Sequence, residues 1–276
     1  MILWQKQVSL KWLARHELQL REIAGCDLAI ITRPGRARSL MQVTCRRQAK
    51  VARLLRNFGG IAEPLPGDWW KQSQAEGRAP IRIGRRLEIV SEPTDAPNSN
   101  RKSQLIIPAA GAFGTGEHAT TAMSLRLLEE ITRELPPGWR LFDAGTGTGI
   151  LALAARKLGA SEVLGLDLDP GAIAHARQNA RLNHISRAKF IATDLLRWRA
   201  IVRYDLITAN LFSELFFAAL PIFRRSLRRE GRLIVSGLLR EQAETVVRAL
   251  CHSGFPIEKQ RRRGKWVALL VRRASD

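Results

Sequence analysis

The second half of the chain alternates between strand-like and helix-like segments, and this alternation restricts the fold more than any other feature. Residues 141–143, 150–158 and 163–167 predict a strand, a helix and a second strand. The same periodicity continues in order with 170–182 (helix), 190–193 and 204–209 (strands), 211–227 (helix), 232–236 (strand) and 241–251 (helix). Residues 255–260 and 265–271 predict a terminal hairpin. The whole pattern is that of an α/β fold with a doubly wound, mostly parallel, seven-stranded sheet covered on both faces.

The first part of the chain has a different pattern. Apolar residues recur at helical spacing over 48–58, and residues 27–32 and 40–44 predict two strands, so we expect a small α+β domain over residues 1–62. Residues 63–100 are rich in Pro, Gly, Asn and Ser and predict a connector, within which 81–90 alternates well enough to form a strand pair docked on one of the domains. Residues 101–276 are the second domain.

The chain is strongly basic, with 45 Lys and Arg residues against 25 acidic residues and a formal net charge of +20. Such an excess attracts RNA, acidic proteins or anionic membrane surfaces, but arginine outnumbers lysine 36 to 9, a skew that GC-rich coding alone can produce. Contact with RNA through the basic surface therefore stays open.

Several classes of protein are excluded. The most apolar window, 211–223, is 13 residues long and contains Glu214, which is too short for the roughly 20 residues of a membrane span. Lys6, Lys11 and Arg15 interrupt the apolar run that a signal peptide needs. The three cysteines are far apart and form no C-x-x-C pair, which argues against a disulfide scaffold and a zinc ribbon. We expect a cytoplasmic protein without a metal and without membrane contact.

A glycine-rich turn joins the first strand of the α/β region to the following helix. It reads Asp143-Ala-Gly145-Thr-Gly147-Thr-Gly149, but Ile150 stands where the dinucleotide fingerprint requires its last glycine. Asp167 ends the next strand 22 residues after Gly145, a spacing at which a carboxylate reaches ribose hydroxyls. The turn and this acid predict a nucleoside pocket, whereas Asp169 before Pro170 predicts a helix N-cap.

A second loop, Ala112-Phe-Gly-Thr-Gly-Glu-His-Ala-Thr-Thr121, precedes a predicted helix. With this loop, the glycine turn and the blocks at 68–70, 83–87, 165–170 and 209–211, the sequence resembles the PrmA family, the methyltransferases of ribosomal protein L11. The resemblance implies a class I, Rossmann-like methyltransferase domain with S-adenosyl-L-methionine as its cofactor. It implies that cofactor contacts come from Thr121, the turn of Gly145 and Gly147, Asp167 and Asn210.

The resemblance also implies roles for single residues. Asn210 lies beside the transferred methyl group and is the expected catalytic residue. Methyl transfer from a sulfonium to a neutral amine needs no base in the transferring step, so we expect His118 to hold the loop rather than to act as a base. Asp194 either contacts adenine or caps a surface turn. Four departures from the family pattern leave the substrate open. Residues 108–111 read Pro-Ala-Ala-Gly where the family has Asp-Pro-Gly before the loop, Ala119 follows His118 in place of proline, Thr146 replaces cysteine, and 210–213 read Asn-Leu-Phe-Ser.

The function that these residues predict is transfer of methyl groups to lysine or N-terminal amino groups of a protein, with a ribosomal protein as the expected partner. One alternative keeps the chemistry and changes the substrate to RNA, a small molecule or another protein. A second alternative is an RNA-associated protein without catalysis, which the intact set of Gly145, Asp167 and Asn210 disfavours.

Overall fold

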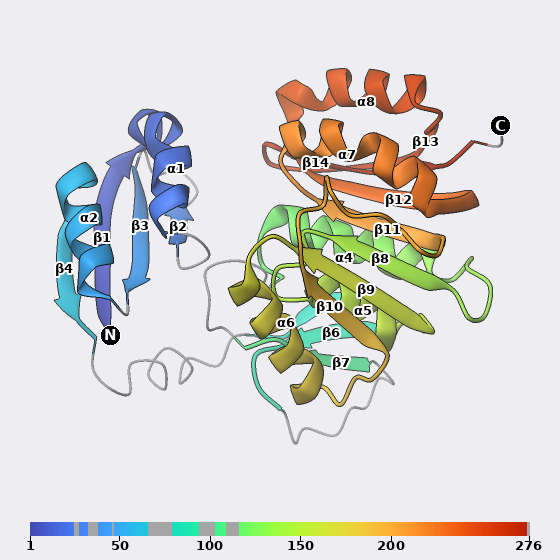
Figure 1. Ribbon diagram of the computed structural model, residues 1–276, viewed down its shortest axis with the longest axis horizontal. Coiled ribbons are helices and arrows are strands. Elements are labelled where there is room, and N and C mark those ends of the chain that lie inside the picture. The colour runs from blue at the N-terminus through green and yellow to red at the C-terminus, as the bar shows by residue number, and fades with distance from the viewer. Residues whose placement is uncertain are drawn as a thin grey trace. The chain divides into compact units, whose positions relative to one another are not determined.

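A computed structural model describes residues 1–24, 28–32, 38–45, 47–65, 79–93, 103–108 and 116–274 (Figure 1). The chain divides into two compact units. The described residues up to 65 belong to the first unit and those from 79 onward to the second. The strand pair predicted within 81–90 therefore belongs to the second unit. Within the described residues, no helix combines the length and the apolar character that crossing a membrane requires.

The described residues of the first unit form a four-stranded sheet with two helices. Its elements are β1 (Ile2–Ser9), α1 (Leu10–Ala24), β2 (Leu28–Thr32), β3 (Arg38–Cys45), α2 (Gln48–Phe58) and β4 (Ile61–Pro64). The strand order is β2-β3-β1-β4, and β1 runs antiparallel to both of its neighbours. Trp4, Met41 and Leu54 are fully buried between the sheet and the helices. The predicted helix and two strands are confirmed, whereas β1, α1 and β4 were not predicted.

The second unit contains the predicted seven-stranded sheet. From β8 onward, the elements in chain order are β8 (Arg140–Ala144), α5 (Ile150–Lys157), β9 (Glu162–Asp167), α6 (Pro170–Leu182), β10 (Ala188–Ala192), β11 (Tyr204–Asn210), α7 (Ser213–Ser226), β12 (Leu227–Leu239), η2 (Arg240–Gln242), α8 (Ala243–His252), β13 (Ile257–Arg263) and β14 (Trp266–Arg272). The strand order is β10-β9-β8-β11-β12-β14-β13. The first five strands in this order are parallel and β14 is antiparallel to both of its neighbours, which confirms the predicted fold.

Two apolar clusters cover the two faces of this sheet. Neighbouring residues of one strand point to opposite faces, so Leu206 packs with the helices α4 (Ala119–Ile131), α5 and α6, while Ile207 packs with α7 and α8. One connection between strands carries no helix, as the predicted order of elements indicated. Residues 193–203, which connect β10 to β11, are described throughout and form no helix.

A small third sheet packs against α4. It consists of β5 (Ile81–Ile83), β6 (Leu87–Val90) and β7 (Ser103–Ile106), of which β7 was not predicted. Glu129 of α4 is buried and accepts hydrogen bonds from the side chains of Arg86, at 3.2 Å, and Arg133, at 2.7 Å. Burial acts to raise the pKa of the Glu129 carboxyl, but these two arginines outweigh it and the pKa is lowered. The ionised Glu129 thus ties the turn between β5 and β6 to the helix.

Candidate functional site

The candidate site lies at the carboxyl ends of β8, β9 and β11. Strand order reverses at β8, because the chain first adds β9 and β10 on one side and then returns to place β11 on the other. Ligands of open α/β sheets bind at such a switch point. Ala144 of β8 pairs with Ala209 of β11, so Gly145 and Asn210, the next residues of each strand, leave the sheet side by side.

The glycine turn needs glycine for two different reasons. Gly145 has φ +71°, and a Cβ there would lie 2.5 Å from Cδ2 of Leu211. Gly147 has φ +52°, and a Cβ there would meet open space. The backbone of Gly147 is therefore accessible to a ligand, as the sequence predicted for a nucleoside-binding turn.

The buried side chain of Asp143 holds this turn through hydrogen bonds. Its side chain is 1% exposed and accepts hydrogen bonds from Oγ1 of Thr146, at 2.7 Å, and from Oγ1 of Thr208, at 2.6 Å. Burial raises the pKa of the Asp143 carboxyl to about 6, although both hydroxyl groups act to lower it. Thr208 was missed by sequence reasoning, and its hydroxyl within the apolar strand β11 is the signal that could have found it.

Asp167 lies at the end of β9 and closes over the turn. Its Oδ2 accepts from the backbone N–H of Gly147 at 2.8 Å, and its Oδ1 accepts from the N–H of Asp169 at 3.0 Å. The structure thus brings Asp167 to the glycine turn with which the sequence paired it by spacing. Each carboxylate oxygen can accept about two hydrogen bonds, so capacity remains for both hydroxyls of a ribose. This donor set and the open backbone fit a nucleoside cofactor.

Thr121 and Asn210 meet although they are 89 residues apart in the sequence. Thr121 is in the first turn of α4, and its Oγ1 accepts from Nδ2 of Asn210 at 3.5 Å. Ser236 of β12 fixes the same turn, because its Oγ donates to the carbonyl oxygen of Thr120 at 3.2 Å. His118 precedes the helix, with its Nδ1 2.8 Å from Oγ1 of Thr120 and its ring 5.2 Å from that of Trp266. These contacts agree with a role in holding the loop.

The comparisons with known proteins decide the family. A family model described as "Ribosomal protein L11 methyltransferase (PrmA)" matches residues 37–274. The chain belongs to this family. The resemblance identified from the sequence is therefore confirmed.

The relatives and solved structures agree with this family. A ribosomal protein L11 methyltransferase of Lacticaseibacillus paracasei is 37% identical over 213 residues, which are 76% of this chain and 65% of that protein. One of Pelobacter propionicus is 35% identical, over 81% of this chain and 74% of that protein. The chain thus spans just under two thirds of the first relative. The crystal structure of the L11 methylase of Lactobacillus delbrueckii subsp. bulgaricus has a TM-score of 0.64 at 32% identity and covers 72% of this chain and 100% of that one.

The structure also tests the remaining predictions for PrmA-like residues. Asp169 is an N-cap as predicted, since its side chain accepts from the N–H of Gly171 at 2.7 Å. Asp194 accepts from the N–H of Leu196 at 2.9 Å and lies 3.7 Å from Arg197, which is the surface-capping arrangement; its contact with adenine stays a prediction. Thr146, the departure from the family's cysteine, donates to Asp143. The blocks at 68–70 and 112–115 lie outside the described residues.

Proposed function

We propose that the chain is an S-adenosyl-L-methionine-dependent methyltransferase that methylates amino groups, of lysine or of an N-terminus, on a ribosomal protein in the cytoplasm. The observation that carries this proposal is the convergence of the glycine turn, Asp167 and the Asn210–Thr121 pair at one sheet edge. Membership in a family of ribosomal protein L11 methyltransferases supports both the chemistry and the class of substrate.

Five residues hold the cofactor in this proposal. Asp167 accepts hydrogen bonds from the ribose hydroxyls, the exposed backbone of Gly145 and Gly147 lies along the cofactor, and Thr121 closes over it. The cofactor supplies a methyl group on a positively charged sulfur. Asn210, at the end of β11, contributes its side-chain amide beside that methyl group.

Asn210 acts by orientation rather than by proton transfer. Its Nδ2 is engaged by Thr121, which turns its amide oxygen into a fixed acceptor for the N–H of an incoming amine. A neutral amine attacks a methyl sulfonium without a base in the transferring step, so alignment of the reacting atoms is the main contribution. Lysine has a reference pKa near 10.4, so the reactive fraction and the rate should both rise with pH.

The first unit is the proposed substrate-recognition domain, over residues 1–62. It has its own apolar core around Trp4 and Leu54, which allows it to present a surface independently of the cofactor site. A chain beginning near Glu63 should keep cofactor binding and lose methylation of the protein substrate. Full activity from that shortened chain would remove the first unit from substrate recognition.

The direct experiment uses purified protein, radiolabelled S-adenosyl-L-methionine and a ribosome-containing lysate. The label should be destroyed by protease, persist after ribonuclease and be strongly reduced with Asp167→Ala at subsaturating cofactor. The +20 charge favours RNA as the second candidate substrate. Ribonuclease-sensitive label that falls steeply with salt would establish RNA in its place, because each neutralised phosphate adds a slope of about −0.7 to −0.9 in log–log terms.

A further inference from the structure

A pocket lies on the sheet where a covering helix is missing. A parallel sheet needs cover on both faces, yet the described connection 193–203 between β10 and β11 is a loop. On this face Leu164 of β9 and Ile191 of β10 belong to the apolar cluster of α7 and α8, and Leu195 and Trp198 of the loop cover them in part. The uncovered remainder is a concave apolar surface.

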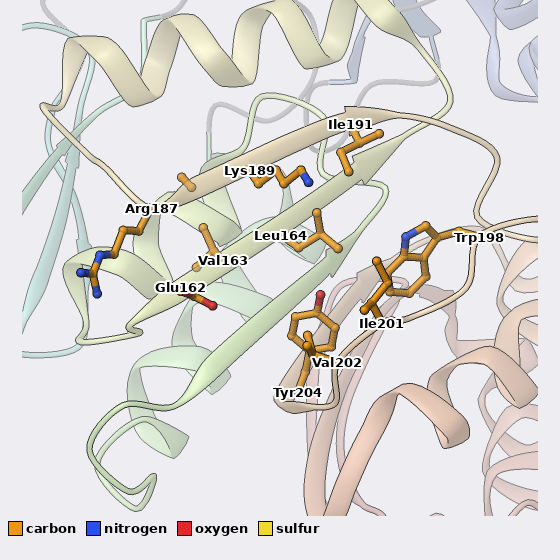
Figure 2. Close-up of a pocket in the computed structure, with 11 residues that line it drawn as sticks. Glu162, Val163, Leu164, Arg187, Lys189, Ile191, Trp198, Ile201, Val202 and Tyr204 are labelled. Atoms are coloured by element: carbon orange, nitrogen blue, oxygen red, sulfur yellow. The ribbon is translucent and has the colours of Figure 1, made fainter.

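This pocket has a volume of about 500 Å³ (Figure 2). Its floor is formed by β9 and β10, and its other wall by the loop and the start of β11. Ile201 is 99% exposed and Val202 is 40% exposed at this wall, so apolar side chains face solvent at the mouth. Pockets for small ligands are typically about 300–1,000 Å³ and mostly apolar, with a few fixed polar groups.

The polar groups of the pocket are mainly hydrogen-bond donors. Figure 2 shows the ammonium group of Lys189, the indole N–H of Trp198 and the hydroxyl of Tyr204 directed toward the space between the strands and the loop. The Trp198 ring is fixed by Phe142, with centroids 4.6 Å apart. Burial raises the pKa of Tyr204, so its hydroxyl keeps its proton and can donate at neutral pH.

Acceptors are scarce by comparison. Among the described residues that line the pocket, Glu162 is the one carboxylate, and it lies 3.3 Å from Arg140 in an ion pair. Arg187 adds a second positive charge at the rim. A pocket with an apolar floor, three inward donors and an excess of positive charge is complementary to a ligand that carries negative oxygens on an apolar body.

We propose that this pocket binds a small amphipathic anion, whose apolar or aromatic body lies on Leu164 and Ile191 and whose anionic oxygens accept from Lys189 and Tyr204. The pocket lies over the face of β9 and β10, whereas Gly147 and Asp167 lie at the carboxyl edge of the sheet. The site is therefore separate from the cofactor site, and its occupation does not depend on the proposed methyl transfer.

The probe for this pocket is the fluorescent anion 8-anilinonaphthalene-1-sulfonate, titrated into the full chain with the cofactor site saturated by S-adenosylhomocysteine. One saturable, blue-shifted binding phase is expected. Lys189→Glu and Ile201→Asp should each weaken binding at least about tenfold, because each places a negative charge against the bound anion. Both side chains are exposed, so thermal unfolding should stay unchanged in these variants.

Matched controls carry the same substitutions elsewhere on the second unit. Lys157→Glu, at the end of α5, and Leu182→Asp, at the end of α6, should leave the affinity unchanged. Thioflavin T, a cationic aromatic dye, should bind at least about tenfold more weakly, as expected when charge decides recognition. Equal affinity of the anion for Lys189→Glu and Lys157→Glu, or displacement of the anion by a single-stranded oligouridylate, would overturn the proposal.

Discussion

The ends of β8 and β9 carry one aspartate each, and the two side chains differ in burial and in their hydrogen-bond partners. Asp143 is buried, and its carboxyl accepts hydrogen bonds from the hydroxyls of two buried threonine residues. Asp167 is half-buried, and its bonds come from backbone N–H groups of the loops that surround the candidate cofactor site. Asp143, on β8, therefore supports the glycine turn, whereas Asp167, on the neighbouring strand β9, is the aspartate proposed to contact the ligand.

Of the substitutions that test this comparison, Asp143→Ala should have the largest effect, and the effect should be on stability. The substitution removes the carboxylate to which the buried hydroxyls of Thr146 and Thr208 both donate. Loss of these two hydrogen bonds should lower the free energy of unfolding by about 3 kcal/mol. Chemical denaturation measures the change. Thr208→Ser, which keeps the hydroxyl, is the control and should lose far less. Equal stability of wild type and Asp143→Ala would remove Asp143 from the support of the turn.

Asp167→Ala should affect binding instead of stability. Loss of a charged acceptor for the ribose hydroxyls should weaken binding of S-adenosyl-L-methionine by about 2 kcal/mol, or roughly 30-fold. Calorimetry of the folded variant measures the affinity. Glu244→Ala, which removes an exposed carboxylate of α8, is the control and should change it little. Unweakened binding in Asp167→Ala would mean that this carboxylate does not face the cofactor.

The raised pKa of Asp143 should make the stability of the protein depend on pH. The folded-state pKa of about 6 lies above the ordinary 3.8, so the stabilisation that the protonated form gives is complete below pH 3.8 and is lost as pH rises through 6. The slope from this one group is at most about 1.4 kcal/mol per pH unit. Asp143→Asn should flatten the curve between pH 4 and 6. A wild-type curve parallel to that of Asp143→Asn would contradict the raised pKa.

Gly147→Ala should lower the stability less than Asp143→Ala does. A left-handed alanine costs about 1 kcal/mol, and open space surrounds the new Cβ. Cofactor affinity should fall more than stability does, because the methyl group occupies the surface that the ligand approaches. Gly138→Ala is the control, since that glycine also has positive φ and open space but lies outside the site. An equal loss of cofactor affinity in both variants would show that the cofactor does not contact the backbone of Gly147.

Local chemistry explains which parts of the site could be predicted. The glycine turn, Asp167 and the Asp169 cap depend on short spacings, and periodicity identified the strands around them. The pairing of Thr121 with Asn210 joins segments 89 residues apart, and only the family resemblance placed both residues at the cofactor site. Helix α1 was missed because Lys11 and Arg15 interrupt its apolar pattern. The connection over 193–203 carries no helix, in agreement with the predicted order, in which strand 204–209 follows strand 190–193 directly.

Asn210 is the residue on which the proposed chemistry depends most, and methylation of purified ribosomal protein L11 tests it directly. Mass spectrometry after incubation with the chain and saturating S-adenosyl-L-methionine should show methyl groups on amino nitrogens. Asn210→Ala should lower the turnover far more than the affinity for the cofactor, as expected for an interaction made in the transition state. An unmodified protein L11 with the wild-type chain, or full turnover with Asn210→Ala, would contradict the account.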